Sequence, residues 1–316
     1  MALEFVAAMR TEGPRKAVTI WWDEITETYN KKESIEGFLL ALPYLIAFGG
    51  FMLFPLLYGF YMSLYDWDAL NPEQSEFIWF GNYQTLLSDA RFWEALLNTI
   101  WFVILTVPPL VIFALLLALG INRNVKGQTV LRTIFFSPYI LTVAVIAIVW
   151  TELFAGEGGF IRYWLGFIME DPPRFLIDPS WAMVSIAVAT IWWAIAFNFI
   201  ILLAARQNVP DRLYEAAKLD GASSYRMLRD ITIPQMRNPL IFVVIITFVG
   251  SFQVFGQPYI MTGGGPSFST HTIVMYLYTT GFAGRAFGYA AAVGYVLFLI
   301  LITISAINYY LLSKNE

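Results

Sequence analysis

The sequence predicts an all-α membrane protein with six transmembrane helices. Of its 316 residues, 58% are hydrophobic and only 13% are charged, and the mean hydropathy is +0.63. Soluble domains carry about a quarter charged residues, so this composition is typical of a chain that lies mostly in lipid. The charged residues are also gathered into a few segments, which leaves long stretches without any.

Six stretches without Asp, Glu, Lys or Arg are long enough to cross a membrane, which takes about 20 residues as a helix. They are residues 37–65, 95–122, 133–151, 179–205, 238–284 and 286–313. The fifth stretch is too long for one span. It contains Gly263-Gly264-Gly265-Pro266, a sequence that ends helices, so we expect a span near 239–260 followed by a loop.

Prolines predict irregularities in the first two spans. Pro43 and Pro55 predict a kink in the first span. Pro108 and Pro109 lie near the middle of the second span and predict a break there, whose free backbone groups neighbouring helices must satisfy. The third span is expected over 134–154.

The basic residues are distributed unevenly between the two sides of the membrane. Fifteen of the 19 Lys and Arg residues fall on the side of the N-terminus. The other four are Arg91, Arg162, Arg174 and Arg285. Because cytoplasmic loops are rich in Lys and Arg, both termini are predicted to lie in the cytoplasm, an N-in/C-in topology.

Two regions follow from this pattern: a cytoplasmic tail over 1–36 and a membrane domain over 37–316. The tail is too polar for a signal peptide. Trp21, Trp22 and Ile25 fit the apolar side of a short interfacial helix, and a disordered tail fits equally well.

The composition excludes several classes of site. The chain has no cysteine, which excludes disulfides and thiolate metal sites, and His271 is its only histidine, which leaves no multi-histidine metal site or His-based catalytic network. None of the six lysines is followed by Ser or Thr, so the phosphate-binding G-x-x-x-x-G-K-[ST] loop is absent. No charge pattern indicates nucleic-acid binding. No ionisable residue lies deep in a span, which argues against a proton relay.

The loop over 206–238 is a charged, helix-forming segment between the fourth and fifth spans. Asn208 is predicted to cap a first short helix, and Gly221 to supply a left-handed turn after it. Ser223 or Ser224 is predicted to cap a second helix. Composition alone leaves open an amphipathic loop that rests on the membrane surface.

The residues of this loop closely resemble the EAA signature of binding-protein-dependent ABC importer permeases. The matching positions are Glu215, Ala216, Ala217, Asp220, Gly221, Ala222, Leu228, Ile231 and Pro234. Five other segments are similar to the carbohydrate-uptake subfamily, which includes maltose, trehalose and glycerol-phosphate permeases: 63–67, 81–83, 98–99, 136–138 and 261–266, the last followed by Thr270. Arg162 departs from the subfamily, which often has Asn at that place.

The resemblance implies a type I ABC importer permease fold in the plasma (inner) membrane of a prokaryote. It implies a subunit without enzymatic activity or a cofactor of its own, which forms half of a pore with a second homologous permease. Two ATPase subunits that bind ATP and magnesium and an extracytoplasmic solute-binding protein complete such a transporter. Glu215, Ala216, Ala217, Asp220, Gly221 and Ala222 are then expected to couple the chain to an ATPase subunit.

Polar and aromatic residues in the fourth and fifth spans are candidates for a substrate pathway, because sugars are recognised by aromatic faces and hydrogen-bonding groups. The candidates are Asn198, Ser251, Gln253 and Gln257, of which Gln253 and Gln257 are expected to share one helix face. Hydrogen bonding between helices is the alternative role of these residues. Trp192 and Trp193 are expected to pack against lipid or a neighbouring helix. Competing functions are a secondary transporter or channel that needs no ATPase, and a membrane enzyme, for which the sequence offers no catalytic constellation.

Overall fold

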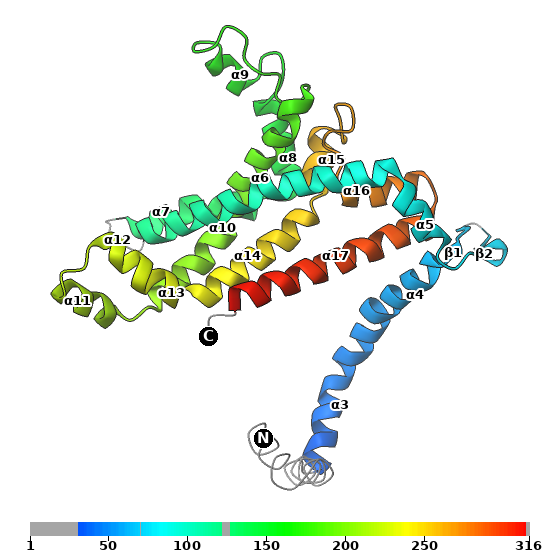
Figure 1. The fold of residues 1–316 in the computed structure, drawn as a ribbon, viewed down its shortest axis with the longest axis horizontal. Coiled ribbons are helices and arrows are strands. Elements are labelled where there is room, and N and C mark those ends of the chain that lie inside the picture. Colours follow the sequence, from blue (N-terminus) through cyan, green and yellow to red (C-terminus); the bar gives the residue numbers. More distant parts are fainter. Residues whose placement is uncertain (1–30, 70, 122–126, 314–316) are drawn as a thin grey trace. The chain divides into compact units, whose positions relative to one another are not determined.

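The computed structural model describes residues 31–69, 71–121 and 127–313 (Figure 1). The predicted tail helix around Trp21, Trp22 and Ile25 lies outside these residues. The chain divides into two compact units, Met1–Tyr61 and Met62–Glu316, which are described separately.

The first span is one apolar helix over Ile35–Ser63 that changes its hydrogen-bond register once. It consists of α3 (Lys31–Phe48), a π-helical turn η1 (Gly49–Leu53) and α4 (Phe54–Ser63). The N–H of Phe54 donates to the carbonyl oxygen of Gly49, five residues earlier. Pro55 has no N–H with which to continue the α-helical pattern. The predicted irregularity near Pro55 is therefore a π-turn.

Four long helices form the bundle of the second unit (Figure 1): α6 (Ala90–Ile121), α10 (Pro179–Gln207), α14 (Arg237–Phe252) and α17 (Phe287–Ser313). The predicted break at Pro108 and Pro109 is wrong, because α6 continues through both residues. α6 packs closely against α10 and α14, and this packing stabilises it as one helix. Ala114, Ala118 and Ala196 are fully buried, and their small side chains let the helices approach closely.

The third span, expected over 134–154, is bent, which was not predicted from the sequence. It consists of α7 (Gln128–Phe136), a 3₁₀ turn η3 (Ser137–Ile140) and α8 (Val143–Leu153), with a bend of 97° between the two halves. Pro138 removes a backbone donor, and Thr142 caps α8 by accepting from the N–H of Val145. The described residues thus hold five unbroken spans, or six when the bent pair counts as one, as the sequence predicts.

Short elements connect the spans. They are β1 (Tyr65–Asp66), η2 (Pro72–Gln74), β2 (Glu76–Phe77), α5 (Gly81–Ser88), α9 (Phe160–Leu165), α11 (Asp211–Leu219), α12 (Ser224–Met227), η4 (Leu228–Thr232), α13 (Ile233–Gln235), α15 (Gly256–Met261), α16 (Ile273–Tyr278) and η5 (Thr279–Ala283). The two strands pair antiparallel, with Tyr65 opposite Phe77. They and α5 lie at the end of the bundle opposite to α11 (Figure 1).

A close contact joins α17 to this strand end. Asn82 of α5 donates through Nδ2 to the carbonyl oxygens of Ser63 (2.9 Å) and Tyr65 (2.8 Å). A Cβ atom on Gly288 of α17 would lie 2.1 Å from the same Tyr65 oxygen. Only glycine leaves the space that this backbone contact requires.

Candidate functional site

The charged loop begins later than the sequence predicts. Asn208 ends α10 instead of starting the next helix, because its N–H donates to the carbonyl oxygens of Ala204 and Ala205. The first loop helix, α11, starts at Asp211, and Pro210 before it provides no side-chain cap. The prediction that Asn208 caps this helix is wrong, because α10 extends two residues further than its apolar stretch.

A left-handed glycine ends α11, as the sequence predicts. Gly221 has a φ of 72°. The N–H of Ala222 donates to the carbonyl oxygen of Ala217 (2.9 Å) and that of Gly221 to Lys218 (3.1 Å), which is the hydrogen-bond pattern of a Schellman motif. Ser223 then caps α12 by accepting from the N–H of Arg226 (3.3 Å).

The signature residues lie together on a surface around this turn. Glu215, Ala216, Asp220 and Gly221 are exposed, and Ala217 and Ala222 are half-buried. Two large apolar side chains stand beside them in solvent, Leu219 at 90% exposure and Tyr225 at 72%. A polar loop that exposes such side chains offers a surface for a partner. We call the exposed residues among 211–225, together with Ala217 and Ala222, the loop surface; Tyr214 is half-buried and is not part of it.

Two arginines at the edge of the loop surface pair with one acidic residue of the same segment. Arg226 lies 3.6 Å and Arg229 3.9 Å from the carboxylate of Asp230. No ion pair joins Glu215 or Asp220 to another residue in the described part of the chain. The acidic groups of the signature are thus available for a partner.

A cavity of about 510 Å³ lies among α8, α10, α14 and α15. All four candidate pathway residues line it: Asn198, Ser251, Gln253 and Gln257. Other residues of the wall are Tyr139, Thr190, Trp193, Phe197, Thr247 and Phe255. No residue of this wall is charged within the described part of the chain.

Two of the candidates also connect helices. Asn198 is buried and donates through Nδ2 to the hydroxyl of Thr247 (2.8 Å), which joins α10 to α14. The hydroxyl of Thr106 in α6 lies within hydrogen-bond distance of two acceptors. They are the carbonyl oxygen of Phe102 in the same helix (2.8 Å) and the hydroxyl oxygen of Ser251 in α14 (3.1 Å). Asn198 and Ser251 therefore both line the cavity and connect neighbouring helices.

Gln253 and Gln257 reach the cavity by a different route from the one expected. The helix ends at Phe252, and Phe255 has a non-helical backbone before α15 starts at Gly256. The two glutamines therefore do not share a helix face, and that prediction is wrong. Gln257 is 5% exposed, and no hydrogen bond joins its amide to another described residue.

An aromatic wall is the feature of the cavity that the sequence did not predict. Tyr139 stacks on Trp193 (5.5 Å between ring centroids) and on Phe197 (5.7 Å). The Nε1–H of Trp193 donates to the carbonyl oxygen of Leu141 (3.1 Å), which fixes its ring. The turn at Pro138 brings Tyr139 to this place, so recognising a break there would have identified the wall.

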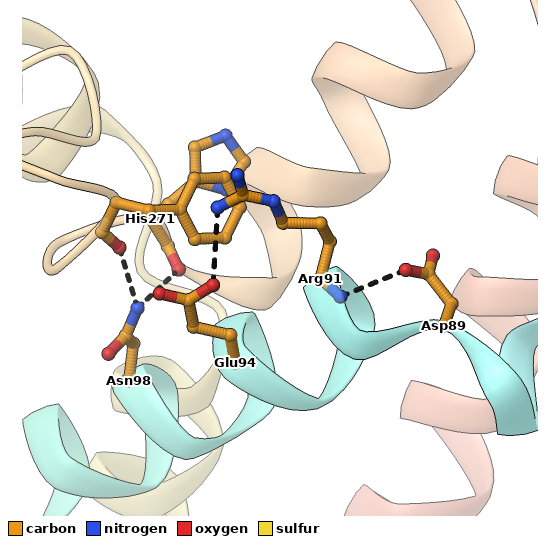
Figure 2. Close-up of polar contacts among 6 residues, drawn as sticks. Asp89, Arg91, Glu94, Asn98 and His271 are labelled. Atoms are coloured by element: carbon orange, nitrogen blue, oxygen red, sulfur yellow. Dashed lines mark hydrogen bonds and ion pairs between the residues drawn. The ribbon is translucent and has the colours of Figure 1, made fainter.

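Polar contacts anchor the loop before α16 to α6 (Figure 2). Asn98 donates through Nδ2 to the carbonyl oxygens of Phe268 (2.8 Å) and His271 (3.3 Å). The guanidinium of Arg91 is 3.2 Å from the Glu94 carboxylate and 4.6 Å from the centre of the Phe268 ring. His271 stacks on that ring at 4.1 Å.

His271 is a packing residue in this anchor. Its Nδ1 is buried and has no hydrogen-bond partner among the described residues. Burial, and after it the positive charge of Arg91, lower the pKa of His271 to about 4. The imidazole is therefore neutral at physiological pH.

Comparisons with known proteins identify relatives over most of the chain. Residues 78–315 match the family described as binding-protein-dependent transport system inner membrane component. The lactose transport system permease protein LacF of Rhizobium radiobacter is 33% identical over 287 residues, which cover 89% of this chain and 95% of the relative.

Solved structures share the fold. A bacterial ABC transporter involved in the import of the acidic polysaccharide alginate superposes with a TM-score of 0.77 at 23% identity, covering 94% of this chain and 99% of that one. A bacterial alginate ABC transporter in complex with an alginate pentasaccharide-bound periplasmic protein gives a TM-score of 0.75 at 23% identity, covering 88% and 94%.

Proposed function

This chain belongs to the binding-protein-dependent transport system inner membrane components, the permease subunits of ABC importers, and we propose that it forms half of the translocation pathway for a sugar or related solute. The observation that carries the proposal is the pairing of an exposed loop surface with an uncharged, aromatic cavity in one bundle. The other half of the pathway comes from a second homologous permease.

The loop surface docks on an ATPase subunit in the cytoplasm. Ala216, Ala217 and Ala222 permit close approach of a partner's backbone, and Glu215 and Asp220 supply carboxylates that make no ion pair with another described residue. Leu219 and Tyr225 supply apolar area, which contributes about 25 cal/mol for each Å² buried. Two such ATPase subunits, which bind ATP and magnesium, drive the transporter. The excess of basic residues on the side of this loop supports its cytoplasmic position.

The cavity binds the solute during transport. Asn198, Ser251, Gln253 and Gln257 offer amide and hydroxyl groups, and the stacked rings of Tyr139 and Trp193 offer an apolar face. This combination suits the hydroxyl edges and the apolar faces of a sugar ring. Without a cationic side chain in the described wall, the cavity favours a neutral solute. A solute-binding protein outside the membrane delivers it.

Reconstitution tests the proposal. The chain is purified with its partner permease and ATPase subunits and placed in liposomes that hold ATP inside, and the solute-binding protein is added outside. Solute uptake that requires both ATP and the binding protein supports the proposal. Uptake by this chain alone, without ATP, contradicts it and identifies a carrier or channel instead.

A further inference from the structure

We propose that Tyr214 is a positioning residue that transmits movement of the loop surface to both spans beside it. This inference rests on the proposed function, because it assigns a mechanical role within a loop that an ATPase subunit moves. Tyr214 directly precedes Glu215 in α11, so a displacement of the exposed signature face displaces its side chain as well.

Tyr214 contacts the end of the fourth span through its ring. Arg206 lies in the last turn of α10, and the centre of its guanidinium group is 4.2 Å from the centroid of the Tyr214 ring. A cation over an aromatic face is attracted by the ring's negative potential. The same cation lies at the negative end of the α10 dipole, which favours its position there.

Tyr214 contacts η4, which precedes the fifth span, through its hydroxyl group. Its oxygen is 2.9 Å from Oγ1 of Thr232, and that hydroxyl donates to the carbonyl oxygen of Met227 (3.3 Å). With its proton used in this way, Thr232 accepts the proton of Tyr214. Thr232 is 3% exposed, and its carbonyl oxygen accepts from the N–H of Met236, the residue before α14.

The other contacts of α11 are less directional. Leu213 packs against the apolar cluster around Phe199 and Leu202, where side chains can slide without breaking a bond. A cavity of about 480 Å³ borders Tyr214, Arg206 and Thr232 on the side of Leu119 in α6. Side chains therefore do not pack tightly on this side of Tyr214. The two contacts of Tyr214 therefore connect α11 with defined geometry to α10 and to η4, whose Thr232 accepts from the residue before α14.

Paired substitutions in the reconstituted complex test this role. Tyr214→Phe keeps the ring over Arg206 and removes the hydroxyl, and Thr232→Val removes its partner at nearly constant volume. The readout is the amount of solute imported per ATP hydrolysed, measured beside the amount of ATPase that co-purifies. Tyr309→Phe, the same change at an exposed tyrosine of α17, is the matched control.

The expected result is a drop of about fivefold in solute per ATP for each variant, the factor that one buried hydrogen bond of about 1 kcal/mol represents. The double variant should lose no more than Thr232→Val alone, because Tyr214→Phe removes a bond that Thr232→Val has already removed, whereas Thr232→Val also removes the bond to Met227. ATPase binding and the Tyr309→Phe control should match the original chain.

Two outcomes overturn the inference. Unchanged coupling in Tyr214→Phe would show that the hydroxyl transmits nothing, and a loss of ATPase binding would show that Tyr214 belongs to the docking surface. A failure of the unmodified chain to bind an ATPase or to require ATP would instead contradict the proposed function itself.

Discussion

Single residues hold the end of the bundle opposite to the loop surface. The anchor around Asn98 and His271 attaches the loop before α16, and the glycine contact at Gly288 attaches α17 to the strand end. Both can be tested without any transport assay, because each makes a defined contribution to the stability of the chain.

His271 should make stability depend on pH. Its pKa is about 4 in the folded chain and about 6.5 when unfolded, so the unfolded state binds more protons between these values. Stability from this group is therefore present above pH 6.5 and is lost as the pH falls toward 4. Thermal unfolding in detergent at pH 7.5 and 5 should show a larger drop for the original chain than for His271→Gln.

The comparison with His271→Gln isolates the effect, because the chain has no second histidine and the carboxyl groups are the same in both proteins. An identical drop in both proteins would mean that His271 is not buried in its neutral form.

Gly288 should not tolerate a methyl group. Gly288→Ala places Cβ against the carbonyl oxygen of Tyr65 and forces the backbones apart, at a cost of about 1–3 kcal/mol. Gly120→Ala is the matched control in α6, where a Cβ meets nothing within 4 Å. Gly288→Ala should unfold at a lower temperature than the original chain, and the control should not. Equal unfolding temperatures would refute the close contact.

At the scale of elements, the turn at Gly221 sets the angle between the two loop helices. Gly221→Val leaves free space around the new side chain but forces a β-branched residue to a φ of 72°, which costs about 1–2 kcal/mol. We expect the protein to insert normally and to hydrolyse ATP without importing solute. Measuring uptake and ATP hydrolysis together in vesicles checks this.

Gly221→Asn is the control for that experiment, because asparagine tolerates the left-handed conformation. It should couple nearly as well as the original chain. Normal uptake by Gly221→Val would contradict the role of the turn.

Helix ends and turns could be predicted from the sequence where a single local residue determines them. The glycine turn at Gly221 and the cap at Ser223 follow from local chemistry, and both were correct. The bend at Pro138 has local signals, the proline and the cap at Thr142, that were not interpreted as a break, whereas the break after Phe252 has no comparable local signal. A single sequence does not show tertiary packing, which keeps α6 helical at Pro108 and Pro109 against local preference.

At the scale of the whole molecule, the cavity brings together residues from both sides of these breaks. The four polar candidates were named from the sequence, but the aromatic wall with Tyr139 was not, since its position depends on the bent third span. Whether the polar residues bind solute stays a prediction.

Gln257 offers the clearest test of that prediction, because it lines the cavity and its amide makes no hydrogen bond to the described residues. Gln257→Leu keeps the volume and removes the polar groups, so uptake should fall about five- to thirtyfold, as expected for a lost contact of 1–2 kcal/mol. Solute binding to the isolated binding protein is the control and should not change. Unaltered uptake would exclude Gln257 from the pathway.

Cross-linking at the loop surface tests most directly whether an ATPase subunit binds this chain there. Because the chain has no cysteine, Leu219→Cys introduces a single thiol at a position that is 90% exposed. In membranes that contain the whole transporter, a short bifunctional reagent should join this thiol to the ATPase subunit, and an impermeant thiol reagent added outside should not label it. Labelling from outside, or no ATPase among the cross-linked products, would contradict a cytoplasmic coupling loop.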